Sequence, residues 1–228
     1  MFLSRNYQPE MMDDFSIEDD RIDRALEELK LVNRFLGGIS TTGSAINKLV
    51  KANHPMNELK ILDVGSGASD ILVALKRKFK DLEITSIDIN KRASRYLKND
   101  SAINYIVCGD VKAIPFKDSK FDLIHASLFF HHFKEEEIKN ILINLFPLCK
   151  HAIIVNDLRR SIFALIGIKL LTGLFSRSDM VKNDAPLSVK RGFTRAELKN
   201  IMDELKYNYI IKRKWAFRWC LIIYITQK

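Results

Sequence analysis

The sequence predicts an α/β fold with a doubly wound, mostly parallel sheet of seven strands, a helical N-terminal cap and an antiparallel C-terminal hairpin. Two observations support this prediction. Short, almost continuously apolar segments alternate with amphipathic segments of about ten residues, as in sheets whose strands are buried on both faces. The last two apolar segments are separated by about one residue, a gap that suits an antiparallel hairpin.

A helical cap is expected before the first strand. Acidic residues and an S-x-x-D sequence that begins at Ser16 are typical of a helix start, and apolar residues then recur at helical spacing. We therefore expect a helix over 17–36. Gly37–Gly38 is expected to end it. A second, shorter helix is expected over 44–52, ended by His54–Pro55.

The alternation of strands and helices follows this cap. We expect strands over 60–64, 83–89, 103–107, 121–128 and 152–155, and helices over 70–79, 91–99 and 135–146. The later elements are an apolar helix over 161–175, a polar loop with Pro186, a helix that opens with the capping box Thr194–Glu197, and hairpin strands over 209–217 and 219–226. We therefore predict a cap over 1–56 and a ligand-binding domain over 57–228, with a lid insertion at 158–192.

The turn after the first domain strand has the residues of a nucleotide site. Gly65 and Gly67, on either side of Ser66, lack Cβ atoms, so the backbone can lie against a ligand where the next helix presents its N-terminus. Asp88 ends the second strand, where a carboxylate can accept hydrogen bonds from both hydroxyl groups of a ribose. The alternative role for Asp88 is to cap the helix that begins at Lys91.

A nicotinamide-dependent oxidoreductase is one class that shares this pattern. Dinucleotide-binding turns usually continue to a third glycine, whereas position 70 of this chain is an aspartate. A carboxylate there opposes a pyrophosphate and tolerates a sulfonium or an ammonium group. The turn therefore argues against this class.

From about residue 58 onward, the chain resembles class I S-adenosylmethionine-dependent methyltransferases of the small-molecule type. Four segments carry the resemblance in the order of the family: Asp63–Ser69, with serine in place of the last glycine of the family's turn, then Asp88, then Gly109–Phe116, then Phe121–Phe133. The segments PEMMDD, LVNRFLGG, NDLRRS and FSRS…PLSVKRGFT are similar to bacterial methyltransferases associated with type III polyketide synthases. The segment after the fourth strand is also similar to quinone methyltransferases.

The resemblance implies a Rossmann-like sheet, S-adenosyl-L-methionine as cofactor, and methyl transfer to oxygen or carbon of a small apolar acceptor that is phenolic, quinone-like or polyketide-derived. Asp63 is expected under the turn, and Asp110 at the adenine amine. The cofactor-binding residues that it implies are Asp63, Gly65, Ser66, Gly67, Asp88, Ile89, Asp110, Val111 and Ser127.

Polar residues after the fourth and fifth strands are the candidates for catalysis and acceptor binding. His131 or His132 is expected to act as general base on a phenol, because histidine titrates near neutral pH; structural packing is the alternative. Asp157 is expected to receive a proton or orient a hydroxyl group, or else to cap the helix that follows. Arg159 and Arg160 are expected to bind an acceptor carboxylate, or to form structural ion pairs.

Composition excludes several other classes. A content of 47% hydrophobic and 29% charged residues fits a globular protein and rules out global disorder. Three isolated cysteines predict neither a disulfide framework nor a metal cluster, so we expect no metal and a cytoplasmic protein. His125 and two further histidines are expected at surface or strand positions. Since no apolar stretch reaches about 18 residues, no transmembrane segment is expected.

The charge is concentrated near the C-terminus. Residues 151–228 carry 15 basic and 6 acidic side chains, which equals the whole net charge of +9. Two alternatives follow: an RNA-directed methyltransferase or nucleic-acid-binding protein, and peripheral contact of helix 161–175 with an anionic membrane, in place of a lid or core role. Aromatic and basic residues do not alternate as in stacking platforms, which argues against nucleic acid. The expected partner is a small-molecule acceptor, and the expected assembly is a monomer or homodimer.

Overall fold

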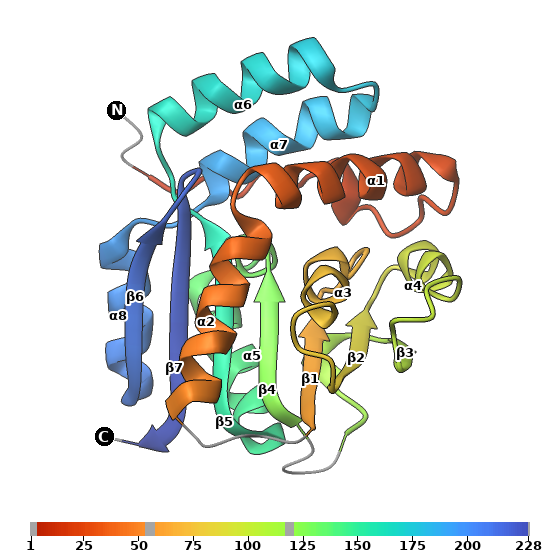
Figure 1. Cartoon of the computed structure of the whole chain (residues 1–228). Helices are drawn as coiled ribbons and strands as arrows, with labels where there is room; N and C mark the ends of the chain where they lie inside the picture. Colours follow the sequence, from red (N-terminus) through yellow and green to blue (C-terminus); the bar gives the residue numbers. More distant parts are fainter. Residues whose placement is uncertain (1–3, 53–57, 117–120, 228) are drawn as a thin grey trace.

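The computed structural model describes residues 4–52, 58–116 and 121–227. Within them, seven strands form one sheet in the order β3–β2–β1–β4–β5–β7–β6 (Figure 1). The strands are β1 Leu59–Val64, β2 Leu82–Asp88, β3 Tyr105–Cys108, β4 Phe121–Ser127, β5 Cys149–Leu158, β6 Tyr207–Lys214 and β7 Arg218–Gln227. β1 to β5 pair in parallel, and β7 runs antiparallel to β5 and β6. The predicted mostly parallel sheet with a C-terminal hairpin is confirmed.

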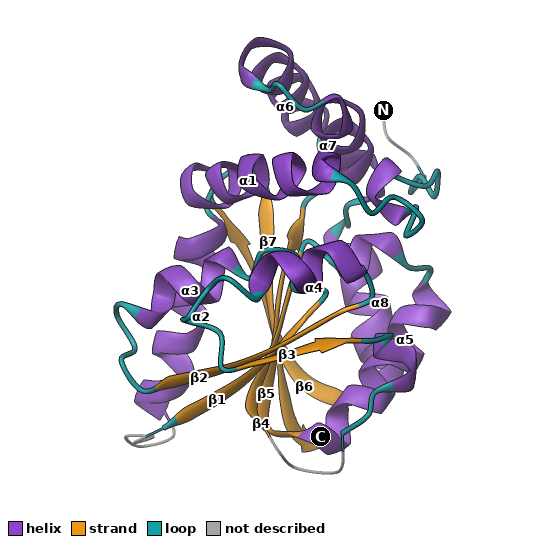
Figure 2. Ribbon diagram, turned by 90° about the vertical axis from the view of Figure 1, so that its right-hand side faces the viewer, coloured by secondary structure: helices purple, strands orange, loops and turns teal. Residues whose placement is uncertain are grey.

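Helices cover both faces of the sheet and the end at which its parallel strands terminate. They are α1 Asp20–Phe35, α2 Gly38–Ala52, α3 Asp70–Lys76, α4 Lys91–Leu97, α5 Glu135–Leu145, α6 Ile162–Phe175, α7 Asp179–Arg191 and α8 Arg195–Leu205, with short 3-10 turns at Met11–Asp13, Val111–Ala113, Phe130–His132 and Phe146–Leu148. Figure 2 shows α2 and α3 on one face and α5 and α8 on the other. In Figure 1, α1, α7 and α6 lie above the carboxyl ends of the parallel strands.

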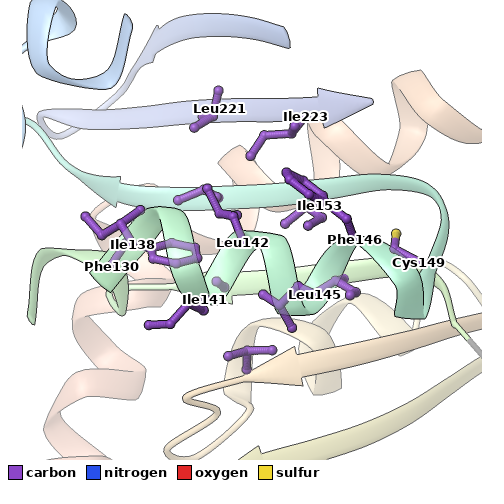
Figure 3. Packing of buried hydrophobic residues seen from close by; sticks show 14 of the residues in the cluster. Phe130, Ile138, Ile141, Leu142, Leu145, Phe146, Cys149, Ile153, Leu221 and Ile223 are labelled. Carbon is purple, nitrogen blue, oxygen red and sulfur yellow. The ribbon is translucent and has the colours of Figure 1, made fainter. Parts of the chain in front are cut away.

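Apolar side chains hold these layers together. On one face, α5 directs Ile138 and Leu142 towards Ile153 of β5 (Figure 3). On the other face, Ile46 of α2 and Leu72 of α3 are fully buried against β1 and β2. Full burial of such a side chain contributes roughly 1.5–3 kcal/mol, so these contacts fix the sheet on which the loops stand.

The N-terminal helices differ from their predicted bounds. α1 begins at Asp20, because the side chain of Asp19 accepts the backbone N–H of Arg21, whereas the hydroxyl group of Ser16 bonds to Asp14. α2 begins directly after Gly37, whose φ of +78° reverses the chain. The first turns of α2 are polar but buried, so the sequence lacks the apolar period that would have predicted them. The expected helix end at His54–Pro55 lies outside the described residues.

The segment expected as a polar loop is a helix. α7 spans 13 residues and contains Pro186. Proline removes one backbone donor from a helix interior, at a cost of about 3 kcal/mol. Buried Met180, Val181 and Leu187 offset that cost, and the side chain of Ser178 caps the helix by accepting the N–H of Val181. The prediction of a loop was wrong because tertiary packing outweighs the local effect of the proline.

The C-terminal elements follow the prediction more closely. The side chain of Glu197 accepts the N–H of Thr194, and the hydroxyl group of Thr194 accepts the N–H of Glu197, so the predicted capping box is confirmed. The hairpin turn has three residues, Trp215–Phe217, and not one, because Ala216 and Phe217 both adopt positive φ.

None of the described helices combines the length with the apolar character that a membrane-spanning segment needs.

Candidate functional site

A cavity of about 570 Å³ lies at the carboxyl ends of β1, β2 and β4, beneath α1 and α7. The loops after these strands contribute Gly65–Ala68, Asp88–Asn90, Gly109–Lys112 and Ser127–Phe129 to its wall. The N-terminal segment and α7 contribute Glu10 and Arg191 on the opposite side. Ligands of open α/β sheets bind in this crevice, so most of the predicted site residues converge on the expected edge, whereas Asp63, Asp157, Arg159 and Arg160 do not line the cavity.

The turn after β1 has backbone conformations that favour glycine at two positions. Gly65 has φ of +60°, and a Cβ atom there would lie 2.1 Å from the ring of Phe129. Gly67 has φ of +51°, and its N–H donates to Asp88 Oδ2 at 2.8 Å. The turn is therefore held against the end of β2 by a hydrogen bond between two of the predicted site residues.

Asp88 is held by backbone donors on both oxygens. Besides the N–H of Gly67, it accepts the N–H of Asn90 at Oδ1, at 2.8 Å. Burial raises the pKa of Asp88. A carboxylate has about four lone-pair sites, so these two bonds leave capacity for two hydroxyl donors from the cavity. Asn90 caps α4 by accepting the N–H groups of Arg92 and Ala93, so the capping role considered for Asp88 is wrong.

The remaining predicted cofactor contacts also line the cavity, except Asp63. Asp110 Oδ1 accepts the N–H of Lys112 and opens the 3-10 turn that contains Val111. Ile89 lies in the wall. The hydroxyl groups of Ser66 and Ser127 are buried in the wall without a hydrogen-bond partner among the described residues. Two unsatisfied hydroxyl groups in one cavity fit a polar ligand that would pair with them.

Asp63 lies under the turn, as expected, but it does not face the cavity. Its carboxylate accepts the hydroxyl group of Ser69 at 2.5 Å and the Nδ1–H of His125 at 2.7 Å. His125 is buried and reaches Thr42 of α2 through Nε2, at 3.0 Å. His125 therefore occupies a strand position in β4, as expected, and its buried ring links Asp63 to α2. Asp63 positions the turn through Ser69 and is not among the residues that line the cavity.

Asp70 adds a negative charge to the wall. It begins α3, and its Oδ1 accepts the side-chain N–H of Asn33 from α1 at 3.1 Å. Burial raises the pKa of Asp70 to about 6. A buried carboxylate of this kind is destabilised by its surroundings and is stabilised by a bound cation.

His131 lies between two carboxylates. Its Nδ1 is 2.7 Å from Asp157 Oδ1, and its Nε2 is 3.5 Å from Glu10 Oε1. All three side chains are almost fully buried. Burial disfavours the charged imidazolium, yet Asp157 and Glu10 together raise the pKa of His131 to about 9. The same pair lowers the pKa of Asp157 against the opposing effect of burial. Asp157 therefore orients His131 and does not cap α6.

His132 belongs to a second pair that joins the N-terminal segment to α7. Its Nδ1 is 2.6 Å from Asp13 Oδ1, while Arg191 donates to Asp13 Oδ2 at 2.6 Å and to the carbonyl group of His132 at 2.8 Å. Sequence reasoning missed Glu10, Asp13 and Arg191 as wall residues. The polar sequence PEMMDD was the only signal for Glu10 and Asp13. Arg191 was missed because its segment, α7, was expected to be a loop.

Three side chains could hold a cation. Ligand atoms of Glu10, His131 and His132 all lie within 4.8 Å of one another. A guanidinium nitrogen of Arg191 is 3.5 Å from Glu10 Oε1, so the carboxylate already has a positive partner. We therefore interpret this cluster as an ion-pair network, in which a divalent cation would meet repulsion from Arg191.

The two arginines predicted to bind substrate lie outside the lining of the cavity. Arg160 donates to Glu197 Oε1 at 2.6 Å and to the carbonyl group of Gly192 at 2.8 Å. Arg159 stacks on Phe217, with 5.0 Å between the guanidinium carbon and the ring centroid. The geometry of Arg160 corresponds to the structural ion pair considered for these residues, whereas the cation–π contact of Arg159 was not predicted.

The sequence is similar to those of known methyltransferases. Residues 61–152 match a family model described as a methyltransferase domain. A demethylmenaquinone methyltransferase of Thermotoga maritima is 31% identical over 114 residues, which are 50% of this chain and 49% of that protein. The chain thus spans about half the length of the curated relative that it matches.

Solved structures extend the similarity to nearly the whole fold. The plantazolicin methyltransferase BpumL in complex with SAH has a TM-score of 0.69 at 15% identity, over 93% of this chain and 92% of that one. The magnesium protoporphyrin IX methyltransferase ChlM from Synechocystis PCC 6803 with bound SAH has a TM-score of 0.55 at 16% identity, over 82% and 83%. At such identities, the similarity shows the fold alone.

Proposed function

We propose that this chain, which carries a class I methyltransferase domain, transfers a methyl group from S-adenosyl-L-methionine to oxygen or carbon of a small apolar acceptor. The observation that carries the proposal is the contact between Gly67 and Asp88 at the wall of the cavity. It joins a ligand-facing glycine turn to a carboxylate with lone pairs to spare, in the crevice where such sheets bind nucleosides.

The residues of the wall fit the proposed cofactor. Asp88 would accept the ribose hydroxyl groups, and Asp110 would accept the adenine amine beside Val111. The free hydroxyl groups of Ser66 and Ser127 would pair with polar atoms of the same ligand. Bound S-adenosylmethionine supplies an electrophilic methyl group on a sulfonium.

The negative charge of the wall favours this cofactor over a dinucleotide. Asp70 would attract the cationic groups of S-adenosylmethionine, whereas the same carboxylate would repel a pyrophosphate. The name of the Thermotoga maritima relative supports a quinone-like acceptor, and phenolic and polyketide-derived acceptors belong to the same proposal.

His131 is the candidate catalytic base. His131 lines the cavity, and Asp157 orients its ring through Nδ1. Neutral His131 would take the proton from an acceptor hydroxyl group, whose oxygen then bonds to the transferred methyl group while S-adenosylhomocysteine leaves. With a pKa of about 9, only about 1% of His131 is neutral at pH 7, so turnover should rise about tenfold per pH unit up to that value.

The proposed lid consists of the N-terminal cap and the 158–192 insertion. The segment containing Glu10 and the helix α7 both contribute to the cavity wall, and Asp184 of α7 accepts the N–H groups of Met11 and Met12. Exclusion of water by these elements would protect the reacting groups.

The test is isothermal titration of S-adenosylhomocysteine into the wild-type protein, Asp88→Ala and Asp81→Ala, with NAD as a second titrant. Asp81 is an exposed carboxylate at the other end of β2 and serves as the matched control. We expect micromolar binding of S-adenosylhomocysteine to the wild type and to Asp81→Ala, and binding at least 100-fold weaker to Asp88→Ala. Binding of NAD alone, or equal affinity in all three proteins, would refute the assignment.

A further inference from the structure

Exposed apolar side chains of the described residues are concentrated on α6. Of the fifteen large hydrophobic residues that are exposed in the described parts, seven belong to this one helix: Ile162, Phe163, Ile166, Leu170, Leu171, Leu174 and Phe175. Exposed fractions reach 72% for Phe163 and 75% for Leu174 and Phe175. Contiguous apolar surface of this kind marks a binding face.

α6 is neither part of the core nor part of the cavity wall. Its buried residues are Ala164, Leu165 and Thr172, and the first two pack against Val189 of α7. None of the residues of α6 lines the cavity, whereas several residues of α7 do. Figures 1 and 2 show α6 as the outermost element of the molecule, beyond α7. The helix therefore projects as an apolar ridge.

The apolar surface continues onto the β6–β7 turn. Phe217 packs against the cluster formed by Ala164 and Leu165. Trp215, two residues earlier, is 72% exposed, and its Nε1–H donates to the carbonyl group of Phe35, which is also exposed. Tryptophan beside such a surface is typical of a membrane–water interface, where the ring is partly apolar and the N–H is satisfied.

Basic side chains predominate along the ridge. Between Leu158 and Ser178, the chain carries Arg159, Lys169 and Arg177, besides Arg160 in its buried pair with Glu197, and no acidic residue. The acidic neighbours are Glu28 of α1, which accepts the N–H of Arg177, and Asp179, and both lie at the C-terminal end of α6. Lys169 is exposed in the middle of the apolar face, where a long side chain can bury its methylene groups and keep its ammonium group in water. This combination complements an anionic lipid surface.

We propose that α6, together with the β6–β7 turn, docks the protein on the surface of an anionic membrane. The helix has 14 residues and a length of about 21 Å, too short to cross a hydrocarbon core of about 30 Å, so it would lie along the interface. A convex ridge exposed on most of its circumference inserts into a fluid apolar phase, whereas a second copy of the chain would need a matching groove. This docking goes beyond the proposed methyl transfer and does not depend on it.

Sedimentation with sucrose-loaded vesicles tests the docking. The proteins are the wild type, the triple variant Leu170→Gln/Leu174→Gln/Phe175→Gln, and the control Tyr105→Gln/Ile143→Gln, which removes exposed apolar groups from β3 and α5. With vesicles of equal parts phosphatidylglycerol and phosphatidylcholine, we expect the wild type and the control to bind alike and the triple variant to bind at least tenfold more weakly. With pure phosphatidylcholine, wild-type binding should fall severalfold.

Two further measurements separate membrane docking from unfolding of the variant and from self-association. The thermal unfolding temperature and the affinity for S-adenosylhomocysteine should be the same in the wild type and the triple variant, because α6 lies outside the cavity wall. If neither protein binds S-adenosylhomocysteine, the result contradicts the proposed function and leaves the docking proposal unaffected. Failure of the wild type to bind anionic vesicles, or equal binding by the triple variant, would overturn the docking proposal. A wild-type dimer in sedimentation velocity that is lost in the triple variant, without vesicle binding, would assign the ridge to a second copy.

Discussion

Replacement of Asp157 by asparagine tests the buried pair that this carboxylate forms with His131. Asparagine keeps the shape of the side chain and an oxygen that can accept the Nδ1–H, so the variant removes the charge and, in addition, the acceptor of the backbone N–H of His131. The side chains of His131 and Asp157 are only 2% and 1% exposed, so solvent screens their attraction little. The effect on stability should therefore be large.

The magnitude follows from the pKa of His131. A rise from 6.5 to about 9 corresponds to roughly 3 kcal/mol of preferential stabilisation of the imidazolium in the folded protein. Removal of one partner of a buried ion pair generally costs about 3–5 kcal/mol, which agrees with this value. Because the folded pKa is raised, the contribution is complete below pH 6.5 and is lost as the pH rises through 9.

Urea denaturation from pH 6 to pH 10 measures this contribution. Relative to Asp157→Asn, the wild type should be more stable by at least about 3 kcal/mol at pH 6, and the difference should become smaller by about that amount towards pH 10, where only the lost backbone hydrogen bond remains. Groups that titrate alike in both proteins cancel in the difference. A difference that does not change with pH, or an NMR titration that puts His131 near pH 6.5 in the wild type, would refute the reasoning.

Three further substitutions test the site and its surroundings. Gly65→Ala should destabilise the fold by about 2 kcal/mol, because its φ is positive and its Cβ would meet the ring of Phe129. The control Gly173→Ala should not destabilise the fold, because no atom lies within 4 Å of its Cβ. Urea denaturation measures both effects. Asp70→Asn should stabilise the free protein at pH 7 by up to about 3 kcal/mol but not below pH 4, since the raised pKa of about 6 disfavours the carboxylate above its unfolded value. In calorimetric titrations, Asp70→Asn should also weaken the binding of S-adenosylmethionine more than the binding of S-adenosylhomocysteine. An equal loss of affinity for the two ligands would show that Asp70 does not contact the cationic groups of S-adenosylmethionine. Arg160→Ala should cost about 3 kcal/mol through its buried ion pair and leave S-adenosylhomocysteine affinity unchanged, whereas a changed affinity would restore a role in binding.

The sheet and one side of the cavity could be predicted from local patterns in the sequence. Apolar segments of strand length, separated by amphipathic ones, specify a parallel sheet because only strands buried on both faces can be apolar throughout. The turn at Gly65–Gly67 and the carboxylate of Asp88 could be located because both follow strand ends, and the carboxyl ends of parallel strands share one edge. Local chemistry and chain order were sufficient for these residues.

The other side of the cavity depends on contacts between segments that are far apart in the chain. Glu10 and Arg191 are separated by most of the chain, yet their side chains lie 3.5 Å apart beside His131. No local pattern predicts this contact, since it depends on how the N-terminal segment packs on α7. α7 itself was hidden by Pro186, whose local cost is outweighed by burial of the helix.

The same distinction explains the arginines and the apolar helix. The segment NDLRRS identifies its charges but not their directions; packing directs Asp157 to His131 and Arg160 to Glu197. The apolar residues of 161–175 are equally consistent with a core, a lid or a surface helix, because hydrophobicity alone does not specify what covers a face. Their exposure on α6 follows from the position of α7, which occupies the place next to the cavity and leaves α6 outside it.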